Sequence, residues 1–294
     1  MGNLQHNKTI VVSSPGTSLA VCGSTNFSWR GFFVQSNNAV VLTGTKAIKP
    51  FLAAFENYWT NAKTFRTTPS ATWKSLGLTG ISAKVAFSPH NAENALLATV
   101  AADVAKTKST LLFSLAFLYQ TPGIMRDTLI KATSNNSLFV YGISDKRVGG
   151  FDLLQTDGNV APVFPSALVK KNTPQPFKAE PAGGGGNRMH HKFIVVDFDK
   201  PSARVYLGSY NFSNPADNSN GENLLLIRDR RIAVSYMIEA IRIFDHYRFR
   251  VLQLDAGTAV TQLALKKPPA IGEKAWWASS YENKRKIRDR EIFS

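Results

Sequence analysis

The chain has 294 residues, 44% of them hydrophobic and 19% charged, with one cysteine and a formal net charge of +15. This apolar fraction is ordinary for a globular protein. The single cysteine, Cys22, excludes an internal disulfide. No apolar run of about 18 residues occurs, so no transmembrane helix is expected, and the N-terminal sequence is not that of a signal peptide. As it stands the chain is expected in the cytoplasm, although a longer parent protein could be exported.

The basic balance favours polyanionic partners, either nucleic acid or an anionic membrane surface. The alternative is a set of scattered basic side chains that only keep the protein soluble. Positive charge is enriched in residues 266–294, which hold eight Lys or Arg and four acidic residues among Trp276, Trp277, Tyr281 and Phe293. Such a tail can stack bases, or its aromatic side chains can dock onto the domain, and we expect docking.

The first elements in chain order are strands followed by a helix. Strands are predicted near 4–13, 18–26 and 38–43, and the helix at about 46–62. Phe51, Phe55 and Trp59 recur at four-residue spacing in that helix and predict a stripe that faces the core. Residues 64–82 are rich in Thr, Ser and Gly and are predicted to form a linker.

After the linker, helical and strand patterns alternate. Asn91 is a candidate N-cap of an Ala-rich helix, and the neighbouring His90 is expected to be structural or exposed. The apolar run 109–118 predicts a strand covered on both faces. A helix near 123–133 and a strand at 137–143 then complete a βαβ unit.

The last part of the chain combines an irregular stretch with one long helix. Residues 145–187 end in the run Gly183 to Gly186, which we expect to be a surface loop rather than a path for substrate. A helix at about 230–248 carries apolar residues on one side, so that side is predicted to face the core. It is expected to end in a segment where His246 caps or packs.

A short pattern of polar residues occurs twice. The second copy consists of His190, Lys192, Asp197, Gly208-Ser209-Tyr210-Asn211 and Glu222. The first copy consists of His6, Lys8, Gly23-Ser24-Thr25-Asn26 and Asn37. From the glycine to the last residue is 14 positions in both copies, 23 to 37 and 208 to 222. Two copies with matched spacing predict two related lobes that each supply a His, a Lys, a Ser and an Asn.

Strand geometry predicts which of these side chains lie together. The segment around the second motif is apolar and β-branched, as in a buried strand. Side chains alternate along a strand, so His190 and Lys192 share one face. His191 would then point to the other face, where a packed or solvated histidine is expected. Asp197 has the opposite parity and is expected to be a structural carboxylate.

The residue set suits phosphodiester chemistry without a metal. Histidine can act as a nucleophile or a general acid near neutral pH, and lysine places a fixed positive charge beside a phosphoryl oxygen. Acidic residues do not cluster in the sequence, so neither a metal nor another cofactor is expected. One histidine would attack phosphorus while the other protonates the leaving oxygen.

The paired motifs resemble those of the phospholipase D superfamily, in which HxKx4D and GSxN occur together. The flanking sequences NRMHHKFIVVD and GENLLLI match closely, and GSTNFSWRGFFVQSNNAVVL looks similar; the resemblance covers most of residues 4–45 and 83–250. It implies an α/β fold of two pseudo-symmetric lobes, with mixed sheets flanked by helices, one active site between them and a phosphohistidine intermediate. It also implies that His6 attacks, that His190 protonates, and that phosphate oxygens are held by Lys8, Lys192, Ser24, Asn26, Ser209 and Asn211.

The two copies differ where a carboxylate could support a histidine. Glu222 aligns with Asn37, and Asp197 aligns with Ser13. A carboxylate orients an imidazole and raises its basicity. We therefore expect Glu222 to support His190, and His6 to have only the amide of Asn37.

The position of the first motif predicts an incomplete first lobe. The second motif follows about a hundred residues of lobe sequence, whereas the first follows only five. We expect the C-terminal part of a first lobe in 1–63, the linker in 64–82, a second lobe in 83–250 and a basic aromatic tail in 251–294. An incomplete sheet has an open edge, which could borrow packing from the second lobe or from another chain, as in a homodimer.

The predicted function is that of a metal-independent phosphodiesterase whose partner is a phosphodiester substrate. The charge slightly favours nucleic acid as the substrate. A lipase is also expected to have an apolar access patch or an interfacial helix, and neither is evident in the sequence. One alternative is a phospholipase D that acts on phosphatidyl lipids, with transient binding to an anionic surface. The other is a catalytically inactive fragment that binds polyanions.

Overall fold

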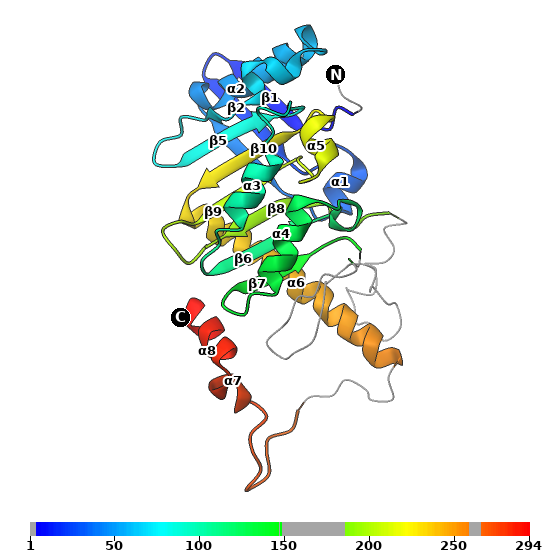
Figure 1. Ribbon diagram of the computed structural model, residues 1–294, viewed down its shortest axis with the longest axis vertical. Coiled ribbons are helices and arrows are strands. Elements are labelled where there is room, and N and C mark those ends of the chain that lie inside the picture. The colour runs from blue at the N-terminus through cyan, green and yellow to red at the C-terminus, as the bar shows by residue number, and fades with distance from the viewer. Residues whose placement is uncertain (1–3, 147, 149–185, 259–265) are drawn as a thin grey trace.

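The computed structural model describes residues 4–146, 148, 186–258 and 266–294. It confirms the predicted α/β class, with two sheets side by side and helices against them (Figure 1). Among the described helices, none combines the length and apolar character needed to span a bilayer. The glycine run at 183–185 lies outside the described residues.

The smaller sheet contains the strands around the first motif. Its antiparallel strands follow the order β1-β2-β3, with bounds Thr9–Ser14, Thr17–Gly23 and Ala39–Thr43. The short helix α1 (Trp29–Phe33) lies between β2 and β3, and α2 (Thr45–Thr60) packs on the sheet after β3. This arrangement places His6 just before β1 and Ser24 just after β2.

The larger sheet has the order β4-β5-β10-β9-β8-β6-β7, and only β6 and β7 pair in parallel. Its strands are β4 (Lys74–Ser75), β5 (Ser82–Phe87), β6 (Thr110–Leu115), β7 (Phe139–Ile143), β8 (Lys192–Val196), β9 (Arg204–Gly208) and β10 (Asn223–Arg228). One face is covered by α3 (Leu97–Val104) and α4 (Ile124–Thr133), and the other by α6 (Arg230–Thr258) (Figure 1). The parallel pair joined by α4 is the predicted βαβ unit.

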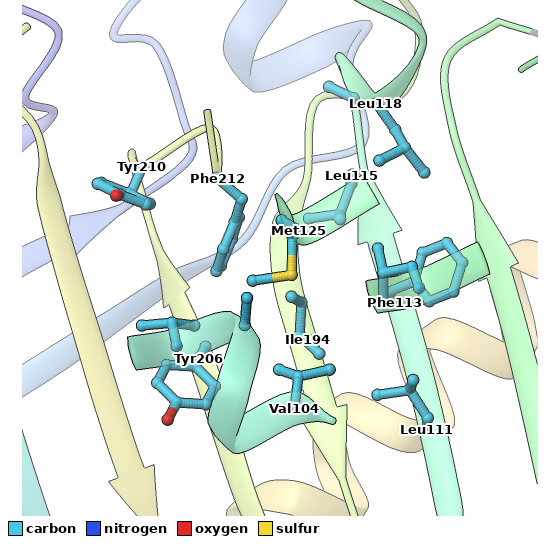
Figure 2. Packing of buried hydrophobic residues seen from close by; sticks show 14 of the residues in the cluster. Val104, Leu111, Phe113, Leu115, Leu118, Met125, Ile194, Tyr206, Tyr210 and Phe212 are labelled. Atoms are coloured by element: carbon cyan, nitrogen blue, oxygen red, sulfur yellow. The ribbon is translucent and has the colours of Figure 1, made fainter. Parts of the chain in front are cut away.

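The central strands of the larger sheet are buried on both faces. Every residue of β6, β8 and β9 is buried, which confirms the prediction from the apolar run 109–118. On one face, Phe113 and Ile194 pack with Tyr206 against Val104 of α3 and Met125 of α4 (Figure 2). This packing fixes β8, and β8 begins two residues after His190.

The remaining described elements are short. They are the 3-10 turns η1 (Phe65–Thr67), η2 (Pro69–Ala71) and η3 (Leu118–Gln120), and the helices α5 (Asn214–Asn218), α7 (Ser279–Glu282) and α8 (Lys284–Ile292). The segment expected to be a linker, 64–82, contains η1, η2 and β4. Since β4 pairs with β5, part of this segment extends the larger sheet.

The predicted core stripe of α2 is wrong in two of its three positions. Phe51 is buried, but Phe55 and Trp59 are 63% and 79% exposed. A step of four residues turns a helix about 40° beyond a full turn, so a strict four-residue repeat drifts off the buried side. The side chains that do face the core are spaced by one, three, three and four residues: Ala47, Ile48, Phe51, Ala54 and Tyr58.

Two helix boundaries also differ from the prediction. Asn91 does not cap α3, because its side chain accepts hydrogen bonds from Glu93 and Asn94 in a turn before the helix. Helix α6 continues to Thr258, ten residues beyond its predicted end, so His246 lies within the helix. No proline or glycine interrupts the sequence between Arg230 and Asp255, and the helix therefore has no signal to stop at 248.

The C-terminal segment docks onto the larger sheet through its last helix. The ring of Phe293 lies 5.4 Å from that of Phe139 and 5.7 Å from that of Phe198. Trp276 and Trp277 remain 52% and 41% exposed. The expected docking of aromatic side chains is thus confirmed for Phe293.

Candidate active site

Backbone bridges between the two sheets bring both motif histidines to one place. Gln5 forms a parallel bridge with Gly221, and Ser36 with Met189. The amide of His6 donates to the carbonyl of Gly221 at 2.8 Å, and that of His190 to the carbonyl of Ser36 at 2.9 Å. Each histidine is therefore held by a segment that belongs to the other copy of the motif.

The side chains follow the same crossed arrangement. Nδ1 of His6 lies 3.3 Å from Oε2 of Glu222. Nδ1 of His190 lies 2.9 Å from Oδ1 of Asn37 and 3.0 Å from the carbonyl of Ser24. The prediction that Glu222 supports His190 is wrong: the carboxylate lies against His6, and the amide of Asn37 lies against His190.

The crossing has a structural cause that single motifs do not reveal. Asn37 lies just before β3, and Glu222 lies just before β10. Each directly follows a residue that bridges to the other sheet, Ser36 or Gly221. The motif alone suggests that a histidine contacts the last residue of its own copy. In the fold, each histidine contacts the last residue of the other copy. Nδ1 of His190 is hydrogen-bonded, and Nδ1 of His6 faces the Glu222 carboxylate without forming a hydrogen bond, so we take Nε2 as the nitrogen that each histidine offers to a substrate.

Two buried lysines accompany the histidines in equivalent positions. Nζ of Lys8 donates to the carbonyl of His6 at 2.7 Å, and Nζ of Lys192 to the carbonyl of His190 at 2.9 Å. Burial lowers the pKa of Lys8 to about 8, against an opposing effect of Glu222. Burial, followed by repulsion from Lys8, holds the pKa of Lys192 well below its usual range. An anion between these lysines would relieve the repulsion, so the site is suited to a phosphoryl group.

The charge state of His190 follows from the same surroundings. Burial, followed by the positive charges of Lys192 and Lys8, lowers its pKa to about 2. The ring is therefore neutral in the empty site at physiological pH. An anion bound between the lysines would oppose their effect and favour protonation of His190.

Phe117 is a site residue that the sequence analysis did not single out. Its ring stands edge-on to His190, with centroids 5.8 Å apart, and lies 5.1 Å from Nζ of Lys192. It lies two residues after the end of β6, inside the apolar run 109–118, so the sequence pattern predicts a core residue at this position. An aromatic face beside an ammonium group favours the charged form of lysine.

The hydroxyls of both motif serines are hydrogen-bonded within the chain. Both are fully buried. The hydroxyl of Ser24 accepts from the amide of Asn38 at 3.0 Å, and that of Ser209 from the amide of Asn223 at 3.0 Å. Each hydroxyl thus holds the start of the strand that ends its motif, and a direct contact with phosphate oxygens stays a prediction.

The motif asparagines differ from the serines. The backbone N–H of Asn211 donates to the carboxylate of Glu222, and the side-chain Oδ1 of Asn211 is buried without a hydrogen-bond partner. Asn26 is half-buried at the equivalent position. A buried polar atom without a partner is rare in a folded protein, so Asn211 stays a candidate for substrate contact.

Asp197 lies away from the histidines, as its strand parity predicts. Its Oδ1 accepts from the amides of Lys108 and Ser109 at 2.9 Å each, and its φ is +53°. The carboxylate ties the end of β8 to the start of β6. It supports the sheet and not the reacting groups.

The other histidines are structural, as expected. His191 points to the opposite face of the strand, fully buried, with Nδ1 3.2 Å from the hydroxyl of Ser114. His90 is buried against Asp217, with Nδ1 2.7 Å from Oδ1. His246 packs beside Tyr247 in α6.

Known proteins resemble this chain in both sequence and fold. Residues 104–244 match the family described as "Cardiolipin synthase, PLD-like domain". A "Phospholipase D" from Rickettsia prowazekii (strain Madrid E) is 46% identical over 48 residues, 16% of this chain and 22% of that protein. The "Mitochondrial cardiolipin hydrolase" of Xenopus tropicalis is 41% identical over 59 residues, 20% of this chain and 26% of that protein.

A solved structure extends the match beyond these segments. The phosphatidylserine synthase of Haemophilus influenzae Rd KW20 superposes with a TM-score of 0.51 at 15% identity, covering 85% of this chain and 62% of that one. The sequence matches span about a quarter or less of the length of the curated relatives. These matches, together with the paired motifs, show that the chain is similar to proteins of the phospholipase D superfamily, in sequence over residues 104–244 and in fold over most of its length.

Proposed function

We propose that this protein hydrolyses a phosphodiester through a phosphohistidine intermediate formed on His6. The observation that carries the proposal is the crossed arrangement, which sets Glu222 against His6, with a buried lysine bonded to the backbone of each histidine. A histidine that attacks phosphorus acquires a positive charge, and the carboxylate stabilises that charge. His190 has only neutral acceptors at Nδ1 and is assigned the proton transfers.

In the first step, the lone pair of His6 Nε2 attacks phosphorus as the bond to the leaving alcohol oxygen breaks. Substrate charge between Lys8 and Lys192 favours protonation of His190, which gives its proton to that oxygen. The lysine ammonium groups stabilise negative charge on the pentacovalent species, a contribution of several kcal/mol in comparable sites. The products of this step are the free alcohol and a phosphoryl group bonded to His6.

In the second step, a water molecule attacks the same phosphorus atom. His190, now neutral, takes a proton from the water as the phosphorus–nitrogen bond breaks. His6 is released as a neutral imidazole, and the product is a phosphate monoester. In both steps, bonds form and break only among the two histidines, the substrate and water, while the two lysines stabilise the charge.

Hydrolysis of bis(p-nitrophenyl) phosphate in EDTA tests the proposal. Wild type should release p-nitrophenol, and His6→Asn and His190→Asn should each reduce turnover at least about 100-fold. His246→Asn, which changes a histidine outside the site, should keep turnover. A folded wild type that releases nothing would contradict the proposal and favour a polyanion-binding protein.

A further inference from the structure

Four aromatic side chains form an exposed cluster on α1 and the turn before it. Phe27, Trp29, Phe32 and Phe33 are 49%, 65%, 60% and 76% exposed. Their rings adjoin, with centroids 6.3 Å apart for Phe27 and Phe32, 6.4 Å for Trp29 and Phe33, and 6.5 Å for Phe32 and Phe33. We call these residues the α1 aromatic cluster. They present one continuous apolar surface to solvent.

This cluster adjoins the candidate site through the chain itself. It lies between Ser24 and Asn37, and both of these residues contact Nδ1 of His190. The side-chain amide of Asn37 also donates to the carbonyl of Gly31 within α1, at 2.9 Å. Asn37 therefore joins the catalytic histidine to the helix that carries the aromatic rings.

The second motif provides an internal comparison, because the same turn recurs as α5. Ser28 accepts from the amide of Gly31, and Ser213 accepts from the amide of Ala216, so both helices have the same cap. The positions of Trp29 and Phe33 are taken in α5 by Asn214 and Asn218. Since the backbone turn forms with asparagine at both positions, the fold does not require aromatic residues there.

We propose that the α1 aromatic cluster inserts into the interfacial layer of an anionic phospholipid bilayer and holds the candidate site at the membrane. Tryptophan and phenylalanine favour the boundary between headgroups and acyl chains. A contiguous apolar surface on a folded protein marks an interaction site. The net charge of +15 complements anionic lipid. This inference rests on the proposed function only for the reaction that the docked site performs.

The composition of the loop favours a bilayer over nucleic acid. Residues 23–37 contain a single charged side chain, Arg30, whose guanidinium donates to the carbonyl of Asn187. A groove for nucleic acid needs several basic side chains along the phosphate backbone. For this surface we therefore favour an anionic bilayer over nucleic acid.

Sedimentation with vesicles of phosphatidylcholine and phosphatidylglycerol tests the proposal. The double variant Trp29→Asn/Phe33→Asn takes its new residues from α5 and should bind vesicles at least about tenfold more weakly than wild type. The matched control Phe55→Asn/Trp59→Asn changes two exposed aromatic residues on α2 and should bind like wild type. Both variants should hydrolyse bis(p-nitrophenyl) phosphate at the wild-type rate.

Fluorescence gives a second reading of the same contact. Vesicles with brominated acyl chains should quench part of the tryptophan emission of wild type, and that part should be missing in Trp29→Phe, which keeps an aromatic ring. Unchanged quenching in Trp29→Phe, or an equal loss of binding in the α2 control, would overturn the proposal.

The vesicle and hydrolysis results separate the two proposals. A wild type that binds vesicles through α1 but hydrolyses nothing would refute the proposed function alone. A wild type that hydrolyses the soluble substrate but ignores vesicles would refute docking alone. If the α1 variant loses affinity for single-stranded DNA and not for vesicles, the cluster is a base-stacking surface and the membrane proposal is wrong.

Discussion

Glu222 and Asn37 occupy equivalent positions in the two motifs, yet one places a negative charge beside a histidine and the other a neutral amide. The fully buried carboxylate of Glu222 lies against His6, and the Asn37 amide lies against His190. Charge therefore develops most favourably on His6. In the proposed mechanism, this asymmetry distinguishes the nucleophile His6 from the general acid His190.

Glu222→Gln should remove this distinction with little change in shape. Gln retains an oxygen that can accept from the Asn211 amide, now 3.1 Å from the carboxylate, so the fold should persist. Without the negative charge, the imidazolium formed on attack loses its partner, and kcat should fall about 100-fold or more. Steady-state hydrolysis of bis(p-nitrophenyl) phosphate and a thermal melt measure both effects. A loss of less than threefold in a folded variant would argue against His6 as nucleophile.

Lys8 gives the site a pH dependence that can be measured without turnover. With a pKa lowered to about 8, Lys8 is charged below that pH and neutral above it in the empty site. Affinity for tungstate, a phosphate-like dianion, should be level below about pH 8 and fall as pH rises above it. Isothermal titration measures this profile. Lys8→Met should bind more weakly at pH 7 and lack the change near 8, and a flat wild-type profile would contradict the assignment.

Helix α2 shows what periodicity can and cannot predict about an element. Its aromatic residues recur every four positions, and this spacing predicts the helix and the burial of Phe51 correctly. It also predicts the burial of Trp59, which is 79% exposed. Which residues face inward depends on how the helix rolls on β1 to β3, and that is set by tertiary packing of Ile48, Ala54 and Tyr58.

Two substitutions on α2 test the corrected face. Phe51→Ala should lower the free energy of unfolding by about 3–5 kcal/mol, because it empties a buried aromatic site. Trp59→Ala should change it by no more than about 0.5 kcal/mol. Urea denaturation followed by circular dichroism measures both. Equal losses in the two variants would show that Trp59 is buried in solution.

At the scale of the whole molecule, the site belongs to neither sheet alone. The unbroken apolar runs of β6 and β8 predicted the larger sheet, and motif spacing predicted that His6 and His190 act together. The crossed pairing of His6 with Glu222 was not predictable, because it depends on bridges such as Gln5 with Gly221, which join segments over 200 residues apart. Exposure of the α1 aromatic cluster is likewise a tertiary property. The division into two lobes at residues 64–82 stays a prediction.

The central claim is that His6 becomes covalently phosphorylated. The most direct test is intact and peptide mass spectrometry after incubation with bis(p-nitrophenyl) phosphate in EDTA, under non-acidic conditions that preserve phosphohistidine. In His190→Asn, attack can proceed because nitrophenolate leaves without a proton, but water is no longer activated. A nitrophenylphosphoryl adduct should therefore accumulate on His6. An adduct on His190 in wild type, or no adduct in a variant that still releases nitrophenol, would contradict the mechanism.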